Sequence, residues 1–313
     1  MAVSGRVGVA VHEFTAPAQV AAIELAEQTG VPAAWLTTGG VGPDAMVIFG
    51  AAAMKTSRIK LGTAIVPTWP RHPLALVSQT VALAQLAPGR FRLGVGPSHK
   101  PGIEGMFGIP FERPFEHLRE YVTILKQALQ QGPFDLNGKR YRVHGRVAEP
   151  PNVPVMLSAL RPGSFRLAGE IADGALAWIC PLPYLRDKAL PALREGAQVA
   201  GREKPLMVAH CFVAVNEDAA AVREASRDRL ANYARLPFYQ EMFAAAGLPE
   251  ARQGTMTDRM LDEIVVHGDE TAVAKRLGEY LDAGMDEVIA SVLIVGQDRR
   301  ASMERTMRAI AAL

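Results

Sequence analysis

Short apolar runs alternate with longer amphipathic stretches along the whole chain. Eight runs have the length and the β-branched content of buried strands, and they cover residues 7–11, 33–37, 59–65, 91–95, 153–158, 175–179, 207–215 and 287–295. Because helical patterns separate nearly all of them, we expect parallel strands joined by crossover helices. Eight such units in 313 residues predict an α/β fold, a (β/α)8 TIM barrel. An open doubly wound sheet is the alternative.

The helical stretches are marked by proline or aspartate at their starts and by glycine at their ends. The clearest one places Phe115, Leu118, Val122, Leu125 and Leu129 on a single face, at helical spacing. The other predicted helices cover residues 17–29, 43–55, 74–86, a segment that starts at 162, a long stretch over 218–264, residues 269–284 and the tail from 300.

Three segments are longer than a minimal barrel unit needs. We therefore expect a single barrel domain over residues 1–313 with insertions near 97–114, 133–150 and 225–265. The first insertion contains residues 101–114, which form either a lid over the cleft or a structural loop that caps the barrel. The second carries Asn137-Gly138, a dipeptide that favours a β-hairpin turn.

The composition is that of a globular protein with a large core, because 49% of the residues are hydrophobic. The net charge of +2 is spread along the chain, which argues against a dedicated nucleic-acid surface. Cys180 and Cys211 are too few for a disulfide scaffold or a cysteine-based zinc site, and they suit a reducing compartment. The longest apolar run, residues 45–54, is too short to span a membrane, and the first residues lack a signal-peptide pattern. We therefore expect a cytoplasmic protein without membrane or nucleic-acid partners.

In a (β/α)8 barrel the active site forms at the carboxyl ends of the strands. Residues 94–99 (GVGPSH) begin like a dinucleotide fingerprint, but His99 stands where the third glycine belongs and Pro97 blocks immediate entry into a helix. We expect this strand exit to bring backbone close to a flat ligand. Residues 158–163 (SALRPG) lead into a helix, and a helix start beside Arg161 is a phosphate-binding pattern.

Ionisable candidates at the strand ends are few. Glu13 follows the first strand, either as a carboxylate at the barrel mouth or as a charge at a helix start. His12 beside it is interpreted as a packed histidine, and the seven histidines do not cluster at metal-ligand spacing. Cys180 is interpreted as a small hydrophobe rather than a nucleophile. A site this poor in acids, bases and metal ligands indicates that a bound organic cofactor supplies the chemistry.

Three motifs, kept in order, resemble the bacterial luciferase-like monooxygenase superfamily. They are residues 57–65 (SRIKLGTAI), 86–96 (LAPGRFRLGVG) and 168–174 (AGEIADG). The resemblance covers about residues 7–295, and members of the superfamily use either FMN or the deazaflavin coenzyme F420. Residues 62–65 (GTAI) and 94–99 are similar to the F420-dependent branch, which includes methylenetetrahydromethanopterin reductase and F420-dependent dehydrogenases.

The resemblance implies a non-prolyl cis peptide bond at Ala64–Ile65, where the bulge of the family backs the deazaflavin ring. It also implies a phosphate site at the start of the helix after the fifth strand, and a homodimer. The residues implied to bind the cofactor are Val11, Thr37, Thr38, Ala64, Ile65, Val66, Gly96, Pro97, Ser98, Ser158, Ala159, Leu160, Arg161, Pro162 and Gly163.

The chain departs from the sugar-phosphate dehydrogenases of that branch after three strands. Gly39-Gly40 replace their Asp-His pair, and His99 replaces their catalytic glutamate. Trp178 and Pro181 stand where they place a threonine and a lysine, so glucose 6-phosphate is not an expected substrate. Glu13 matches a carboxylate of the family and is the first candidate for the catalytic proton donor or acceptor, with His99 second.

We therefore expect an F420-dependent oxidoreductase that moves a hydride between C5 of the deazaflavin and a small organic substrate, without a metal. The first alternative is an FMN-dependent two-component monooxygenase, which needs a flavin reductase as its partner. The second is a non-catalytic flavin-binding protein of the same fold. Because an alcohol needs a base to take its proton, the missing Asp-His pair favours a reductase over an alcohol dehydrogenase.

Overall fold

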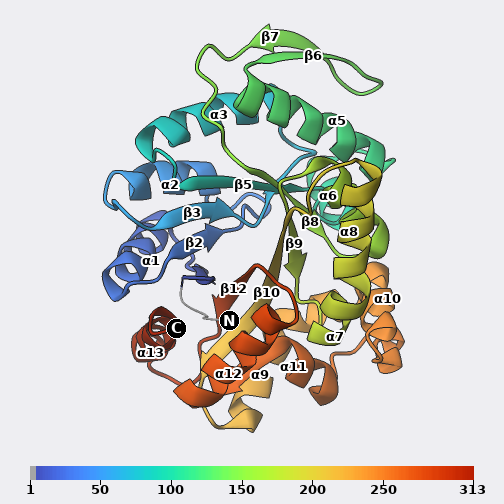
Figure 1. The fold of residues 1–313 in the computed structure, drawn as a ribbon. Helices are drawn as coiled ribbons and strands as arrows, with labels where there is room; N and C mark the ends of the chain where they lie inside the picture. Colours follow the sequence, from blue (N-terminus) through green and yellow to red (C-terminus); the bar gives the residue numbers. More distant parts are fainter. Residues whose placement is uncertain (1–4) are drawn as a thin grey trace.

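In the computed structural model, which describes residues 5–313, eight parallel strands close into a barrel that helices surround (Figure 1). In order around the barrel they are β1 (Val7–Ala10), β2 (Ala33–Leu36), β3 (Lys60–Thr63), β5 (Phe91–Gly96), β8 (Val155–Ala159), β9 (Gly174–Trp178), β10 (Leu206–Val215) and β12 (Glu287–Val292). The ring closes because β12 pairs with both β1 and β10, and β10 pairs with β9. The predicted TIM barrel is confirmed, and each predicted strand overlaps one of these eight.

Four further strands lie outside this ring. β4 (Val66–Pro67) follows β3 and pairs with β5. β6 (Pro133–Asn137) and β7 (Arg142–Arg146) form an antiparallel hairpin, which confirms the turn predicted at Asn137-Gly138. β11 (Val265–Gly268), which the sequence pattern does not predict, pairs with the last residues of β10.

The helices cover the outside of the barrel, and the predicted helix over 218–264 is divided into shorter ones. Pro237 starts a new helix after α9, and Gly247 and Gly254 interrupt the path with φ values of +88° and +76°. The helices are α1 (Ala16–Thr29), α2 (Ala45–Ala53), α3 (Pro73–Leu86), α4 (Lys100–Phe107), α5 (Pro114–Lys126), η1 (Gln127–Gln131), α6 (Pro162–Ile171), α7 (Leu182–Tyr184), η2 (Leu185–Ala189), α8 (Leu190–Val199), α9 (Ala219–Ala234), α10 (Pro237–Ala245), η3 (Pro249–Gln253), α11 (Asp258–Ile264), α12 (Glu270–Asp282) and α13 (Arg299–Ala311).

A separate hydrophobic core fills the inside of the barrel. Its buried members come from six different strands and are Ala10, Ala33, Trp35, Met156, Leu176, Val208 and Ile289. Below them, near the amino ends of β5 and β12, Arg92 Nη1 and Glu287 Oε1 form an ion pair at 2.6 Å. The Arg92 guanidinium also lies 4.5 Å from the centre of the Trp35 ring. Because these side chains close the amino-terminal end, a ligand has access only from the carboxyl end.

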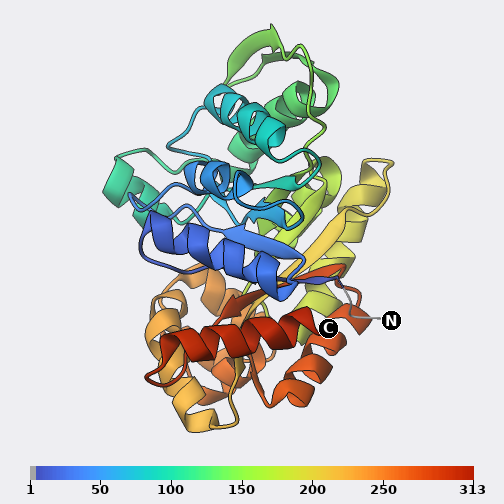
Figure 2. The same ribbon diagram turned by 90° about the vertical axis from the view of Figure 1, so that its left-hand side faces the viewer.

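The outer layer joins the two ends of the chain. A larger buried cluster fills the space between the strands and the helices. Figure 2 shows the C-terminal helix α13 alongside α1, and α13 also contacts β1. Within residues 5–313, no helix is both long and apolar enough to cross a membrane.

Candidate active site

One layer of inward-facing residues lies beyond the barrel core, at the carboxyl ends of the strands. Successive side chains on a strand point to opposite faces, so the next inward position is two residues beyond a core residue. This spacing places in one layer His12, Thr37, Ser158, Trp178, His210 and Ser291. The layer forms the floor of the candidate site, and it mixes hydroxyl, imidazole and aromatic side chains.

A cis peptide bond joins Ala64 and Ile65 between β3 and β4, which confirms that prediction. Thr37 Oγ1 donates a hydrogen bond to the Ala64 carbonyl oxygen at 2.6 Å. The Thr38 N–H donates to the Ile65 carbonyl oxygen at 3.1 Å. Thr38 Oγ1 in turn accepts from the Ala45 N–H at the start of α2, at 3.1 Å. These predicted residues therefore form one hydrogen-bonded unit, in which the half-buried Ala64 and Ile65 lie on the barrel core.

Gly96 packs directly against Ser158 and near Ile65, which leaves no room for a side chain. A Cβ atom added at Gly96 would lie 2.1 Å from Ser158 Oγ and 3.4 Å from Ile65 Cδ1. The chain then leaves β5 through Pro97 and Ser98, and Ser98 takes a φ of +59°. The structure thus brings together the predicted segments 64–66 and 96–98 and the predicted Ser158.

The loop before α6 is held by Ser164. Ser164 Oγ accepts the N–H groups of Leu160 and Arg161, both at 3.0 Å, and donates to the Arg161 carbonyl oxygen at 2.7 Å. The Tyr184 hydroxyl donates to the Leu160 carbonyl oxygen at 3.0 Å. The Arg161 side chain is exposed at the helix start, where the helix dipole favours an anion. The predicted residues 158–163 therefore span the end of β8, a short hydrogen-bonded link and the start of α6, with the Arg161 side chain exposed to solvent.

Aromatic rings line the other side of the mouth. Trp178, at the end of β9, lies 4.3 Å from the His210 ring, 5.6 Å from Phe212 and 5.8 Å from Tyr233 of α9, measured between ring centres. Tyr233 packs at 5.0 Å against Tyr239 of α10. The helices α9 and α10 therefore add a wall of aromatic side chains over β9 and β10.

Two histidines share one serine hydroxyl in the same layer. His12 Nε2 lies 2.9 Å from Ser291 Oγ, and His210 Nε2 lies 2.7 Å from the same oxygen. Burial, followed by the charge of Arg229, lowers the pKa of His12 to about 4. Burial, followed by His12, lowers the pKa of His210 well below its usual value. Both rings are therefore neutral near pH 7.

Residues 2–287 match the Luciferase-like monooxygenase family. The chain belongs to this family. It is 27% identical over 330 aligned positions to 5,10-methylenetetrahydromethanopterin reductase from Methanopyrus kandleri, with 90% of each chain covered. It is 28% identical to F420-dependent glucose-6-phosphate dehydrogenase from Kineococcus radiotolerans, with 84% of this chain and 83% of that protein covered.

Solved structures of the same fold contain either cofactor. An F420-dependent secondary alcohol dehydrogenase in complex with an F420-acetone adduct superimposes with a TM-score of 0.82 at 18% identity, covering 99% of both chains. The oxygenating constituent of 3,6-diketocamphane monooxygenase from Pseudomonas putida, in complex with FMN, gives a TM-score of 0.73 at 17% identity, covering 98% of this chain and 96% of that one. At these identities the similarity establishes the fold alone.

The two predicted catalytic residues of this luciferase-like protein lie apart. Glu13 follows β1 and is half-buried. Burial and the charge of Arg299 lower the pKa of Arg229, and the nearby charge of Glu13 partly offsets this by raising it. His99 follows β5, three strands further around the barrel, and lies between Tyr233 and Tyr239 at 6.0 and 5.7 Å. Burial lowers the pKa of His99, so this ring is also neutral near pH 7.

His210, Ser291 and the tyrosines of α9 and α10 are absent from the residues predicted for this site. His210 and Ser291 can be found from the alternation of side chains along a strand, because each lies two residues beyond an inward-facing residue, Val208 or Ile289. This requires knowing first that Val208 and Ile289 face inward. The interpretation of His12 as a packed histidine agrees with the structure, in which its ring is only partly exposed and forms a hydrogen bond with Ser291. The tyrosines carry no comparable signal, because only the tertiary fold brings α9 and α10 to His99.

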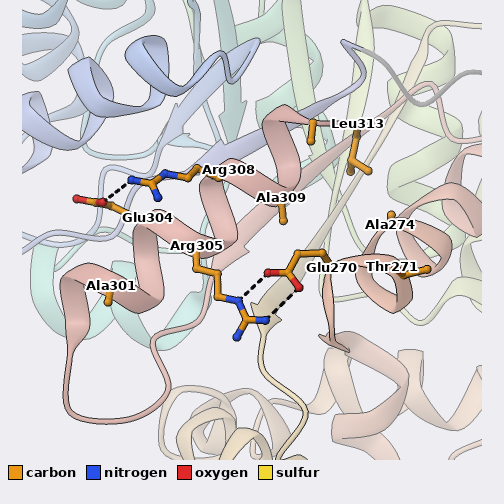
Figure 3. Close-up of a pocket in the computed structure, with 10 residues that line it drawn as sticks. Glu270, Thr271, Ala274, Ala301, Glu304, Arg305, Arg308, Ala309 and Leu313 are labelled. Carbon is orange, nitrogen blue, oxygen red and sulfur yellow. Dashed lines mark hydrogen bonds and ion pairs between the residues drawn. The ribbon is translucent and has the colours of Figure 1, made fainter.

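A surface groove of about 730 Å³ lies away from the strand ends, between α12 and α13 (Figure 3). Its charged side chains pair with one another. Arg305 donates two hydrogen bonds to Glu270, at 2.7 and 3.0 Å, and Arg308 donates to Glu304 at 3.0 Å. None of the predicted site residues lines this groove.

Metal ligands and activated thiols do not form a site in the part of the chain that the structure describes. Within residues 5–313, no three histidine, cysteine, aspartate or glutamate side chains group closely enough to hold a metal ion. Cys180 and Cys211 are buried and form no disulfide. Burial raises the pKa of Cys211 to about 12 and raises that of Cys180 as well, so both side chains are thiols at neutral pH.

Proposed function

We propose that this chain is a coenzyme F420-dependent oxidoreductase that transfers a hydride between C5 of the deazaflavin and a small organic substrate. Family membership and the relatives named as an F420-dependent dehydrogenase and a methylenetetrahydromethanopterin reductase support this proposal. The observation that carries it is the fixed surface of Ala64 and Ile65, held by Thr37 over the barrel core with Gly96 beside it.

The residues at the mouth fit such a cofactor. Gly96 lets β5 lie close to Ser158, where a Cβ atom would collide with the hydroxyl, and Ala64 and Ile65 offer a small apolar surface for a ring. Around the ring and its side chain we place Val11, Thr37, Thr38, Val66, Pro97, Ser98 and Ser158. The phosphate belongs at the start of α6, where residues 159–163 and the Arg161 guanidinium favour an anion. When bound, the deazaflavin supplies two-electron hydride chemistry at C5.

The chain itself supplies substrate binding and proton exchange. Trp178, Tyr233 and Tyr239 exclude water from the β9–β10 side of the mouth and favour an uncharged substrate with apolar or aromatic groups. Glu13 and His99 are candidates to give or take the substrate proton. His99 acts there as a neutral imidazole, because the surrounding tyrosines bury it.

Titration of the purified protein with F420 and with FMN, followed by fluorescence, tests the proposal. We expect F420 to bind more tightly. We expect Arg161→Ala to weaken F420 binding by about 1–3 kcal/mol, because a hydrogen bond to a charged group is lost. Arg194→Ala, which removes another exposed arginine on α8, is the matched control and leaves the affinity unchanged.

Each other outcome favours one alternative. Tight binding of FMN alone would reject the F420 proposal and favour a two-component monooxygenase that works with a flavin reductase, as the FMN-bound structure of the same fold illustrates. Binding of F420 without turnover of any hydride donor or acceptor would favour a flavin-binding protein without catalysis. If Arg161→Ala and the parent bind F420 with equal affinity, the phosphate does not bind at the start of α6.

We also propose that the chain forms a homodimer through α2. The outward side of this helix carries Val47, Gly50, Ala51 and Met54, spaced as one helical face, and none of them is buried. Leu86 of α3 lies next to Gly50 and is also exposed. This apolar surface favours contact with another protein surface over contact with water.

A further inference from the structure

The hydrogen bonds of His12, Ser291 and His210 cross three neighbouring strands of the barrel. His12 follows β1, Ser291 lies on β12 and His210 lies on β10. Ser291 is fully buried and His210 is 4% exposed, whereas His12 is partly exposed. The three side chains therefore form a chain of hydrogen bonds across the floor of the candidate site, and His12 is the most exposed of them.

The shared hydroxyl couples the protonation of the two rings. A serine hydroxyl has one proton to donate, and each neutral imidazole carries its single N–H on either Nδ1 or Nε2. Every atom of the contact is paired when one Nε2–H donates to Ser291 Oγ and the Ser291 O–H donates to the other Nε2. In this arrangement His12 and His210 hold opposite tautomers, and neither ring is free to rotate.

We propose that His12 exchanges a proton with the substrate at the barrel mouth, and that Ser291 and His210 are positioning residues that fix the orientation and the tautomer of its ring. This inference rests on the proposed function, because it places a reacting oxygen or nitrogen of the substrate at the mouth. It assigns a role to three residues of the inward layer, and it makes His12, next to Glu13 in the sequence, a further candidate for proton exchange with the substrate.

The surroundings of each ring support this assignment. The Trp178 ring packs on His210 at 4.3 Å from the β9 side, which leaves the Ser291 contact as the polar partner of His210. Burial and the charge of Arg229 on α9 lower the pKa of His12, so its ring is neutral near pH 7. A neutral ring that donates from Nε2 to Ser291 Oγ has a lone pair on Nδ1, which can accept a proton.

The proton step balances in both directions of the reaction. When a carbinol is oxidised, its O–H bond breaks and the proton bonds to His12 Nδ1, while the electron pair of the C–H bond leaves as hydride to the deazaflavin. The ring becomes an imidazolium whose Nε2–H stays on Ser291 Oγ, and the proton on Nδ1 then passes to solvent. In the reductive direction the neutral ring first takes a proton from solvent on Nδ1, and this proton then bonds to the carbonyl oxygen as the hydride adds to the carbonyl carbon.

Nitrogen-15 NMR of the ligand-free protein tests the hydrogen-bonded chain directly. We expect the Nδ1 and Nε2 shifts to show opposite tautomers for His12 and His210, with signals assigned from His12→Gln and His210→Asn. Ser291→Ala removes the shared partner, and each ring then shows a mixture of tautomers. The same tautomer in both rings of the parent protein, or unchanged shifts in Ser291→Ala, would overturn the proposal.

Kinetics with reduced F420, and with acetone and cyclohex-2-en-1-one as probe acceptors, tests the catalytic role. We expect His12→Gln to lower kcat by about 100-fold or more with an F420 Kd within about twofold of the parent. Ser291→Ala lowers kcat by about tenfold with the same Kd. His144→Gln, an exposed histidine on β7, is the matched control. A kcat of His12→Gln equal to that of the parent overturns the proposal. Failure of the parent to bind F420 rejects the proposed function instead, and the NMR measurement of the tautomers then tests the hydrogen-bonded chain by itself.

Discussion

At the scale of single residues, Gly96 has the strictest steric requirement among the predicted cofactor-binding positions. An added Cβ atom would lie 2.1 Å from Ser158 Oγ, closer than real Cβ atoms approach other atoms, and 3.0 Å from Ser158 Cβ. We expect Gly96→Ala to displace β5 from β8, to lower the free energy of unfolding by roughly 1–3 kcal/mol and to weaken F420 binding. Urea unfolding and an F420 titration measure the two effects.

A glycine without neighbours provides the control. An added Cβ at Gly105, within α4, meets no atom within 4 Å. Gly105→Ala is therefore expected to be neutral or to stabilise the protein by up to about 1 kcal/mol, since alanine favours a helix. Ser158→Ala in the Gly96→Ala background removes the closest contact and is expected to recover part of the loss. Parent-like stability and binding in Gly96→Ala would contradict the steric requirement.

The residues that the sequence could and could not predict differ for a physical reason. Thr37, Gly96 and Ser158 follow from barrel geometry, because each lies at the carboxyl end of a predicted strand. His210 lies within β10, whose residues are buried on both faces, so hydrophobic alternation does not say which residues point inward. The inward orientation of Ser291 in β12 cannot be predicted for the same reason. Their contact with His12 depends on the register of three strands, which no local pattern encodes.

At the scale of elements, one carboxylate joins α1 to the segment that leads into β3. Glu27 accepts the backbone N–H groups of Ser57, Arg58 and Ile59, with distances between 2.7 and 3.1 Å. Burial alone would raise the pKa of Glu27, but these three donors and the Arg58 charge lower it below its usual value. A carboxyl group whose pKa is lower in the folded protein adds stability above its unfolded pKa, and this stability is lost as the pH falls through the folded pKa.

We therefore expect Glu27→Gln to lower the free energy of unfolding by about 1 kcal/mol at pH 7, a value reduced by partial exposure to solvent. The difference from the parent should shrink as the pH falls below the usual carboxyl pKa of 4.5. Urea unfolding between pH 3.5 and pH 8 measures it. Glu24→Gln, on the same helix, is the control, because its ion pair with Lys55 is exposed and contributes little. A difference that is constant with pH would contradict the role of the Glu27 charge.

The elements that the sequence missed are short or depend on packing. The sequence predicts a lid or a capping loop over residues 101–114, whereas most of the first half of this segment belongs to the helix α4 (Lys100–Phe107). Pro101, Gly102 and Gly105 give it a low helix propensity, and the buried side chain of Ile103 holds it in place. The four residues of β11 form a strand because they pair with the last residues of β10, and not because they show a hydrophobic alternation of their own.

At the scale of the whole molecule, the barrel could be predicted because its unit repeats eight times, whereas association with a second copy depends on one surface. The helix α2 (Ala45–Ala53) has no charged or hydrogen-bonding side chain in its sequence AMVIFGAAA. A helix that is apolar on all sides is usually buried on all sides. Only its inner side packs in the protomer, through Met46, Phe49 and Ala53, while Val47 is 68% exposed.

A second copy of the chain that packs its own α2 on this surface would bury the outer side, and a twofold axis would bring identical apolar residues together. We therefore expect sedimentation velocity to give twice the protomer mass of 33.7 kDa for the parent protein. Val47→Glu should give the protomer mass at the same concentration, because the dimer would bury an unpaired carboxylate. Val199→Glu places the same charge at a residue that is 74% exposed on α8 and should leave the dimer intact. A parent protein that sediments as a monomer at every concentration, or a Val47→Glu variant that stays dimeric, would remove α2 as the contact surface.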